Sequence, residues 1–99
     1  MNMPTETRLI DYRVLAKAAE VLKTVAHPLR LRIVELLEGE ELSVTALQEA
    51  LGVTQSATSQ HLSQMRTRGI LASRRDGNMV YYSIANPDVV RVIHCMRRA

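Results

Sequence analysis

The chain has 99 residues, a length that suits one domain spanning residues 1–99 and is too short for two. Apolar residues make up 46% and aromatic residues 3%, with no Trp or Phe, so the core must consist of aliphatic side chains. No apolar run approaches the roughly 20 residues that span a bilayer, and a single cysteine excludes an internal disulfide. We expect a cytoplasmic protein without membrane association.

Charge is distributed unevenly along the chain. The formal net charge is +3, but residues 1–50 hold six basic and eight acidic side chains, whereas residues 51–99 hold seven basic and two acidic ones. No acidic residue lies between Ala50 and Arg75. A basic half on a near-neutral body is typical of proteins that bind a polyanion.

Two helices are predicted in the N-terminal half. Asp11 is a suitable N-cap for a first helix of about 13 residues, and the dipeptide His27-Pro28 ends it. A second helix begins at the proline and ends before Gly39. The apolar residues that recur at helical spacing in the first helix are Val14, Ala18, Leu22 and Val25.

A helix-turn-helix is predicted next. Ser43 can cap a short third helix that ends at Gly52, and Thr54 can cap a fourth helix from Gln55 to Arg68. Two helices joined by a tight turn that contains glycine form this motif.

A β-hairpin and a last helix complete the chain. The β-prone segments 70–75 and 79–84 flank Asp76-Gly77, a dipeptide that favours a two-residue hairpin turn. Asn86-Pro87 then supplies a cap and a first-turn proline for the last helix. The predicted fold is therefore mainly α with a small β-hairpin, in the order α-α-α-α-β-β-α, which is a winged helix-turn-helix.

One face of the fourth helix carries short polar side chains, and the opposite face is expected to pack on the body. Short hydroxyl and amide side chains let a helix approach bases and phosphates in the major groove of DNA. A merely solvated face would usually carry Glu and Lys, and this one has neither. The predicted DNA-binding residues here are Thr54, Gln55, Ser56, Ser59, Gln60, Ser63 and Arg66. The residues predicted to face the body are Thr58, His61, Leu62 and Met65.

The hairpin supports the same interpretation. Arg74 and Arg75 lead into its tip and Asn78 follows it, so the hairpin is predicted to place two cations beside phosphates. No catalytic motif occurs, so an enzyme is not expected. The main hypothesis from these residues is a protein that binds DNA sequence-specifically; the role of transcriptional repressor comes from the family resemblance described next. The alternatives are a winged helix used only for protein–protein contact and a non-specific architectural DNA binder.

Four segments resemble the ArsR/SmtB family of repressors: 27–33, 41–44, 54–62 and 74–82. They read HPLRLRI, ELSV, TQSATSQHL and RRDGNMVYY, and the match covers about residues 12–96. The resemblance implies a homodimer held by the first and last helices. It also implies an operator with inverted-repeat symmetry, half-sites about 34 Å apart, and release by an inducer.

The family's usual sensor sites are not matched. The cysteine pair that arsenic-type members carry in the third helix is replaced here by Ser43 and Thr45, and redox-type members have a cysteine where this chain has Glu35. The positions of the zinc ligands hold Asn86, Asp88 and Ala99. No metal or other cofactor is therefore predicted, and the inducer, whether small molecule, metal or oxidant, stays open.

The remaining histidines and the cysteine are predicted to be mainly structural. His61 is expected to hold the fourth helix against the body, and His27 to be a turn or capping residue. His94 and Cys95 are adjacent on a helix and point about 100° apart, so they cannot bind one ion together. Cys95 is expected to be a small buried hydrophobic residue; less favoured is a sensor thiol formed by two copies of Cys95 across a dimer.

Overall fold

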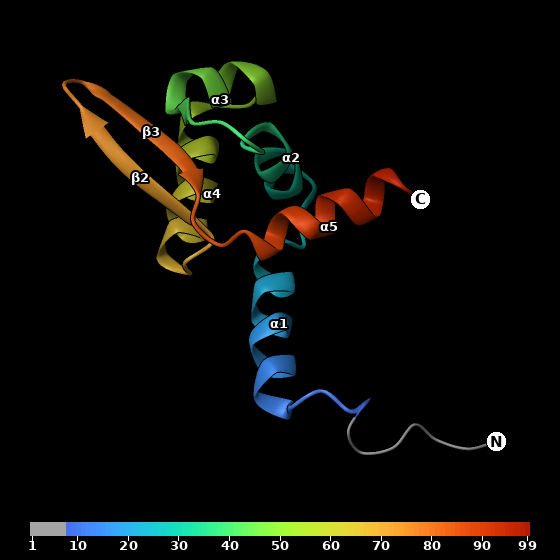
Figure 1. Ribbon diagram of the computed structural model, residues 1–99. Coiled ribbons are helices and arrows are strands. Elements are labelled where there is room, and N and C mark those ends of the chain that lie inside the picture. The colour runs from blue at the N-terminus through green and yellow to red at the C-terminus, as the bar shows by residue number, and fades with distance from the viewer. Residues whose placement is uncertain (1–7) are drawn as a thin grey trace.

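The computed structural model describes residues 8–99, which form five α-helices and one three-stranded antiparallel sheet (Figure 1). The helices are α1 (Tyr12–Val25), α2 (Pro28–Leu36), α3 (Val44–Leu51), α4 (Gln55–Thr67) and α5 (Asp88–Arg97). The strands are β1 (Leu42–Ser43), β2 (Leu71–Asp76) and β3 (Met79–Ile84). This order confirms the predicted winged helix-turn-helix. Residues 1–7, which the single-domain prediction includes, lie outside the described range.

The predicted helix caps are present. The Asp11 carboxylate accepts a hydrogen bond from the Arg13 amide at 2.8 Å, and His27 Nδ1 accepts one from the Leu29 amide at 3.1 Å. His27 is thus the capping residue that the sequence predicts. Asn86 Oδ1 likewise accepts from the Asp88 amide at 3.0 Å, although α5 begins one residue after the proline rather than at it.

The hairpin turn lies one residue further along than predicted. Asp76 pairs with Met79, so Gly77 and Asn78 form the loop and β2 extends to Asp76. Gly77 has a φ of 62°, and within residues 8–99 no residue other than glycine has a positive φ. A positive φ at the first loop residue alone is the pattern of a type II′ turn, whereas Asp-Gly predicts type I′.

The strand β1 was not predicted. Leu42 pairs with Tyr82 and Ser43 with Tyr81, which gives the sheet order β1-β3-β2. A two-residue strand has no alternation of apolar and polar residues to detect, and Ser43 also caps α3. The strand β1 matters because it fixes the segment before α3 to the hairpin.

The core lies between α2, α3, α4, the sheet and the buried face of α5. It is almost entirely aliphatic, as the composition predicts, and Tyr82 is the one aromatic member among the described residues. The buried apolar residues are Val25, Ile33, Val34, Leu37, Leu47, Leu62, Met65, Ile70, Leu71, Tyr82, Val89 and Ile93.

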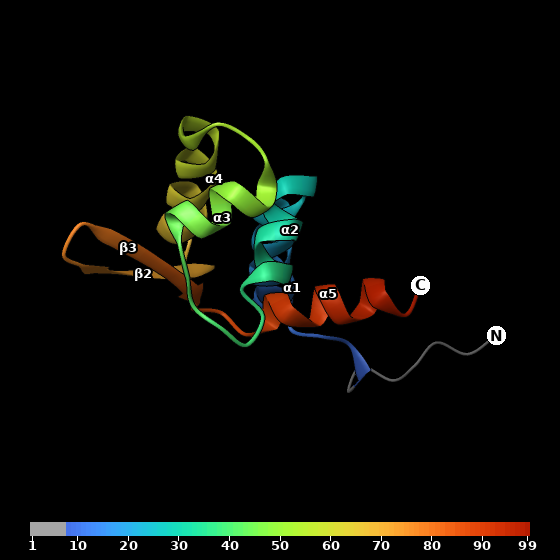
Figure 2. The ribbon, with the colours of Figure 1, turned by 90° about the horizontal axis from the view of Figure 1, so that it is seen from above.

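The helix α1 packs on this core only at its C-terminal end. Thr24 and Val25 are buried, whereas Val14 is 56% exposed and Leu22 50% exposed. The predicted helical stripe is therefore present, but most of it has no partner among residues 8–99. Figure 1 shows α1 extending away from the other helices, and Figures 1 and 2 both show the hairpin and the end of α5 projecting in opposite directions.

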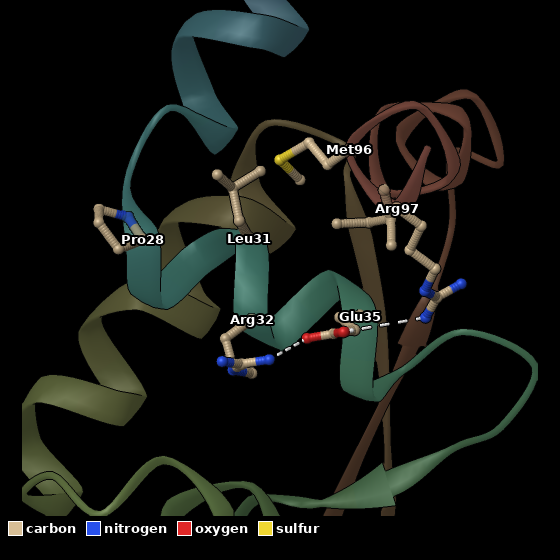
Figure 3. Close-up of a pocket in the computed structure, with 7 residues that line it drawn as sticks. Pro28, Leu31, Arg32, Glu35, Met96 and Arg97 are labelled. Carbon is tan, nitrogen blue, oxygen red and sulfur yellow. Dashed lines mark hydrogen bonds and ion pairs between the residues drawn. The ribbon is translucent and has the colours of Figure 1, made fainter. Parts of the chain in front are cut away.

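Ion pairs hold α5 against α2 and the turn that follows it. Arg97 lies 2.8 Å from the Glu38 carboxylate and 3.9 Å from that of Glu35 (Figure 3), and His94 also pairs with Glu38. The hydrogen bonds from His94 and then Arg97 lower the pKa of Glu38 below its ordinary value of 4.5. Cys95 is exposed, which corrects the expectation of a buried thiol, because it lies two residues after the buried Ile93 and so about 200° around the helix.

A single guanidinium fixes the orientation of α4. Arg30 on α2 donates from Nε to His61 Nδ1 at 3.0 Å, from Nη1 to the Thr24 carbonyl at 2.9 Å, and from Nη2 to Gln64 Oε1. The rings of His61 and His27 lie 4.6 Å apart. His61 is thus a structural residue, as predicted, and Arg30 is the partner that sequence reasoning missed.

The pKa of His61 is lowered from its ordinary value of 6.5, first by desolvation and then by His27 and the positive charge of Arg30. A neutral ring is required here, because Nδ1 accepts a hydrogen bond from a cation.

We predict that Arg30→Met lowers the free energy of unfolding by about 1–3 kcal/mol, because it leaves His61 Nδ1 and the Thr24 carbonyl without their donor. Arg32→Met on the same helix is the matched control, since Arg32 pairs only with the partly exposed Glu35 in the described structure and should cost less than about 1 kcal/mol. Urea titration of both variants measures the difference. Equal losses would show that Arg30 has no special role.

We also predict that stability falls as the pH is lowered from 7 to 5. His61 has a depressed pKa in the folded state, so below about 6.5 the unfolded chain binds more protons and unfolding becomes easier. In His61→Asn, the side-chain oxygen can replace Nδ1 as acceptor but does not titrate. Urea midpoints at several pH values should show a smaller decline for this variant than for the wild type, and identical declines would contradict the assignment.

Candidate nucleic-acid interface

Side-chain caps and one glycine hold α3 and α4 in a fixed relation. The Ser43 hydroxyl accepts from the Ala46 amide at 3.0 Å at the start of α3. Gly52 ends α3 with a φ of 69°, a left-handed conformation that glycine adopts without steric cost. Thr54 Oγ1 then accepts from the Ala57 amide at 3.1 Å and starts α4. The three residues between the helices thus form the tight turn that the sequence predicts.

The two faces of α4 are arranged as predicted. Thr58, Leu62 and Met65 are buried and His61 is half-buried against α2. The Thr58 hydroxyl donates to the Thr54 carbonyl at 2.9 Å, so its polar atom is satisfied. The residues predicted to bind DNA are all exposed: Thr54, Gln55, Ser56, Ser59, Gln60, Ser63 and Arg66. The helix therefore presents a polar surface without carboxylates.

An open groove of about 340 Å³ separates the start of α4 from the hairpin. Gln55 and Ser59 line it from α4, and Asn78 lines it from the hairpin turn. The structure therefore brings together predicted residues that are far apart in sequence. The exposed side chain of Thr45 and the half-buried Gln48 line the same groove from α3. Sequence reasoning missed these two, although their spacing of three residues on α3 places them on one helix face.

The structure separates the two hairpin arginines. Side chains alternate along a strand, and Arg75 is the register partner of Val80, which lines the groove with α3 and α4. Arg75 therefore lies on the face of the hairpin that carries Val80. Arg74 is the partner of Tyr81 and lies on the opposite, outer face, where it pairs with Glu41.

Two further observations limit the chemistry of the described residues. No helix between residues 8 and 99 is long and apolar enough to cross a membrane. Within the same range, no three His, Cys, Asp or Glu side chains gather closely enough to hold a metal ion. Glu35, at the position of a redox cysteine in the family, pairs with Arg32 and Arg97 instead.

The chain resembles known regulators in sequence. Residues 27–73 match the model of the bacterial regulatory protein, arsR family. The transcriptional repressor PagR of Bacillus anthracis is 47% identical over 85 residues, which cover 85% of each chain. The transcriptional activator HlyU of Vibrio cholerae is 37% identical over 83 residues, which cover 84% of this chain and 77% of HlyU.

Solved structures of the same two regulators are also similar to this chain. The crystal structure of PagR has a TM-score of 0.76 at 45% identity, with 87% of this chain and 99% of PagR covered. Reduced HlyU has a TM-score of 0.82 at 36% identity, with 88% and 92% covered. The chain belongs to the ArsR family of bacterial regulatory proteins: it is a DNA-binding transcriptional regulator with a winged helix-turn-helix fold, and not an enzyme.

Proposed function

We propose that the protein is a cytoplasmic repressor that binds, as a homodimer, an operator with inverted-repeat symmetry, and that an inducer releases it. The observation that carries the proposal is the exposed face of α4, which has no carboxylate and lies beside a polar groove. Repression is favoured over activation because PagR, named a repressor, shares 47% identity, whereas HlyU, named an activator, shares 37%. A role limited to protein–protein contact is not favoured by the family.

The N-terminal end of α4 is proposed to read bases. Gln55 is exposed in the first turn and lines the groove, and a Gln amide can form two hydrogen bonds with adenine in the major groove. Ser56 and Ser59 are short enough to let the helix backbone come close to base edges and phosphates. Ser63 and Arg66, further along the exposed face, are proposed to contact the phosphate backbone.

The proposed dimer is supported by apolar surface that the single chain leaves exposed. Val14, Leu15 and Leu22 on α1 and Met96 on α5 are each at least 45% exposed. An open groove of about 650 Å³ between α1, the start of α5 and the end of α4 is largely apolar on its α1 side. Exposed apolar surface of this kind marks a protein interaction site, and the position on the first and last helices agrees with the arrangement that the family resemblance implies.

The proposed inducer does not act through the family's usual metal-binding positions. Ser43 and Thr45 offer hydroxyls where arsenic-type members offer thiolates, and the Ser43 hydroxyl is already used to cap α3. Soft metals prefer thiolate ligands, so these positions are not suited to them. We therefore propose that the protein needs no resident metal or other cofactor to fold or to bind DNA.

The first prediction for this function is that the wild-type protein binds duplex DNA with an affinity that falls steeply with salt. The slope of log K against log salt concentration should be roughly −0.9 for each phosphate neutralised. Gln55→Ala should then cost about 1–3 kcal/mol on a selected operator when the base it reads is adenine. Fluorescence anisotropy with the operator and single-base variants measures both effects.

The comparison between DNA sequences supplies the control. If Gln55 reads a base, the variant should lose its preference at one position and keep its affinity for random duplex DNA. An equal loss on every sequence would make Gln55 a phosphate contact. Weak binding to random duplex DNA, with an affinity that does not change with salt, would contradict DNA binding through this surface.

The second prediction is that Leu22→Glu converts the dimer to a monomer, because it places a charge in the exposed apolar stripe of α1. Ala16→Glu is the matched control, because it adds the same charge at an exposed position outside the apolar stripe. Ala16 lies about 160° around α1 from Val14, which belongs to that stripe. Sedimentation equilibrium should give a dimer for the wild type and Ala16→Glu and a monomer for Leu22→Glu. A monomeric wild type would contradict the proposed dimer.

A further inference from the structure

The hairpin carries its charges on two different faces. Val80, the register partner of Arg75, lines the groove beside α4, and Arg75 has no ion-pair partner among residues 8–99. Arg74 and Asp76 alternate with Arg75 along β2 and therefore lie on the outer face. Adjacent arginines that look equivalent in sequence thus have different surroundings.

Arg74 is held by two groups at once, the Glu41 carboxylate and the Tyr81 ring. Its Nε and Nη2 donate to the two carboxylate oxygens of Glu41, both at 2.8 Å, and its guanidinium carbon lies 4.5 Å from the centroid of the Tyr81 ring. A planar guanidinium matches a carboxylate in this bidentate geometry and also stacks on an aromatic ring. The hydrogen bond from Arg74 lowers the pKa of Glu41 below its ordinary value of 4.5, as expected for a carboxylate paired with a cation.

The sheet register explains why these residues meet. Glu41 directly precedes β1, and Ser43 of β1 pairs with Tyr81, which in turn pairs with Arg74. Ser43, Tyr81 and Arg74 therefore share a face, and Glu41, two residues before Ser43, lies on the same side. The short strand β1 is thus what carries the carboxylate to the arginine.

A phosphate that approaches Arg74 must compete with a carboxylate attached to the same protein. Glu41 already uses two of the guanidinium nitrogens and neutralises its charge. Asp76 adds a second negative charge on that face. Arg75 has no such competitor in the described structure, so it is the hairpin cation that is available to DNA.

We propose that Glu41 limits the sequence-independent affinity of the hairpin for DNA: it holds Arg74 away from the phosphates and so leaves the hairpin with one phosphate-binding cation, Arg75. This inference rests on the proposed DNA-binding function. Phosphate contacts are independent of sequence, so an additional one raises affinity for all DNA alike. By holding Arg74, Glu41 therefore keeps the affinity for DNA of any sequence lower and less dependent on salt.

The test compares binding to random duplex DNA between 50 and 200 mM salt. Glu41→Gln should release Arg74 for one more phosphate contact, which steepens the slope of log K against log salt concentration by about 0.9. Affinity should then fall about threefold to fourfold more over this range than for the wild type. Glu40→Gln is the matched control, because it removes the same charge from the neighbouring exposed residue, for which no ion pair occurs in the described structure.

Two arginine variants complete the test. Arg75→Met should remove one phosphate contact and so reduce the slope of log K against log salt concentration by about 0.9, whereas Arg74→Met should leave the slope unchanged. The double variant Glu41→Gln/Arg74→Met should return to the wild-type dependence, which shows that the effect of Glu41→Gln acts through Arg74.

The outcomes separate this inference from the proposed function. A wild type that does not bind duplex DNA would overturn both. If the wild type binds DNA, two results would overturn this inference alone. One is that Glu41→Gln behaves like Glu40→Gln, and the other is that Arg74→Met reduces the salt dependence as much as Arg75→Met does. Carbon NMR of the free protein gives a readout without DNA: the pKa of Glu41 should rise in Arg74→Met, and an unchanged pKa would show that the ion pair does not form in solution.

Discussion

The surface that we propose for DNA binding depends on the rotation of α4 about its own axis. Burial of Leu62 and Met65 holds the helix on the body, but apolar burial is not directional and leaves its rotation loosely specified. Arg30 supplies the direction, because its planar guanidinium bonds to both His61 and Gln64. A shift of one residue would turn α4 by about 100° and move the row of hydroxyls off the exposed face.

The distribution of carboxylates follows a related constraint. Glu35, Glu38 and Glu41 each pair with an arginine or histidine, and all three lie outside α4 and the groove. Their charges are therefore neutralised locally, on the α2–α5 side and on the outer face of the hairpin. The exposed face of α4 and the Val80 face of the hairpin are left without a negative side chain, although the net charge of the chain is only +3. Placement, rather than the total charge, makes this surface suitable for a polyanion.

Local signals in the sequence were sufficient for most of the fold. Side-chain caps at Asp11, Ser43 and Thr54 and the left-handed Gly52 act within a few residues of themselves, so each helix boundary could be read nearly to the residue. The polar and buried faces of α4 followed from a helical period over its 13 residues.

What could not be predicted depends on contacts between distant segments. The pairing of Asp76 with Met79, and with it the turn at Gly77, is decided by the register of two strands rather than by the dipeptide. Arg30 meets His61 across 31 positions, and Arg74 meets Glu41 across 33. Neither pairing leaves a periodic trace in the sequence. For the same reason the two hairpin arginines looked equivalent until β1 and the alternation of β2 assigned them to opposite faces.

The same guanidinium that orients α4 also connects it to the surface proposed for dimerisation. Arg30 donates to the carbonyl of Thr24, in the last turn of α1, where that helix is buried. The exposed part of α1 continues from this turn without a break, so Arg30, together with the buried Thr24 and Val25, holds the apolar stripe of α1 in one geometry with the polar face of α4. In the proposed dimer, contacts made by α1 with the partner would set the distance and angle between the two copies of α4. Inverted-repeat DNA demands a fixed half-site spacing, and a residue that ties both helices together is the shortest physical route by which a change at the dimer surface would alter that spacing.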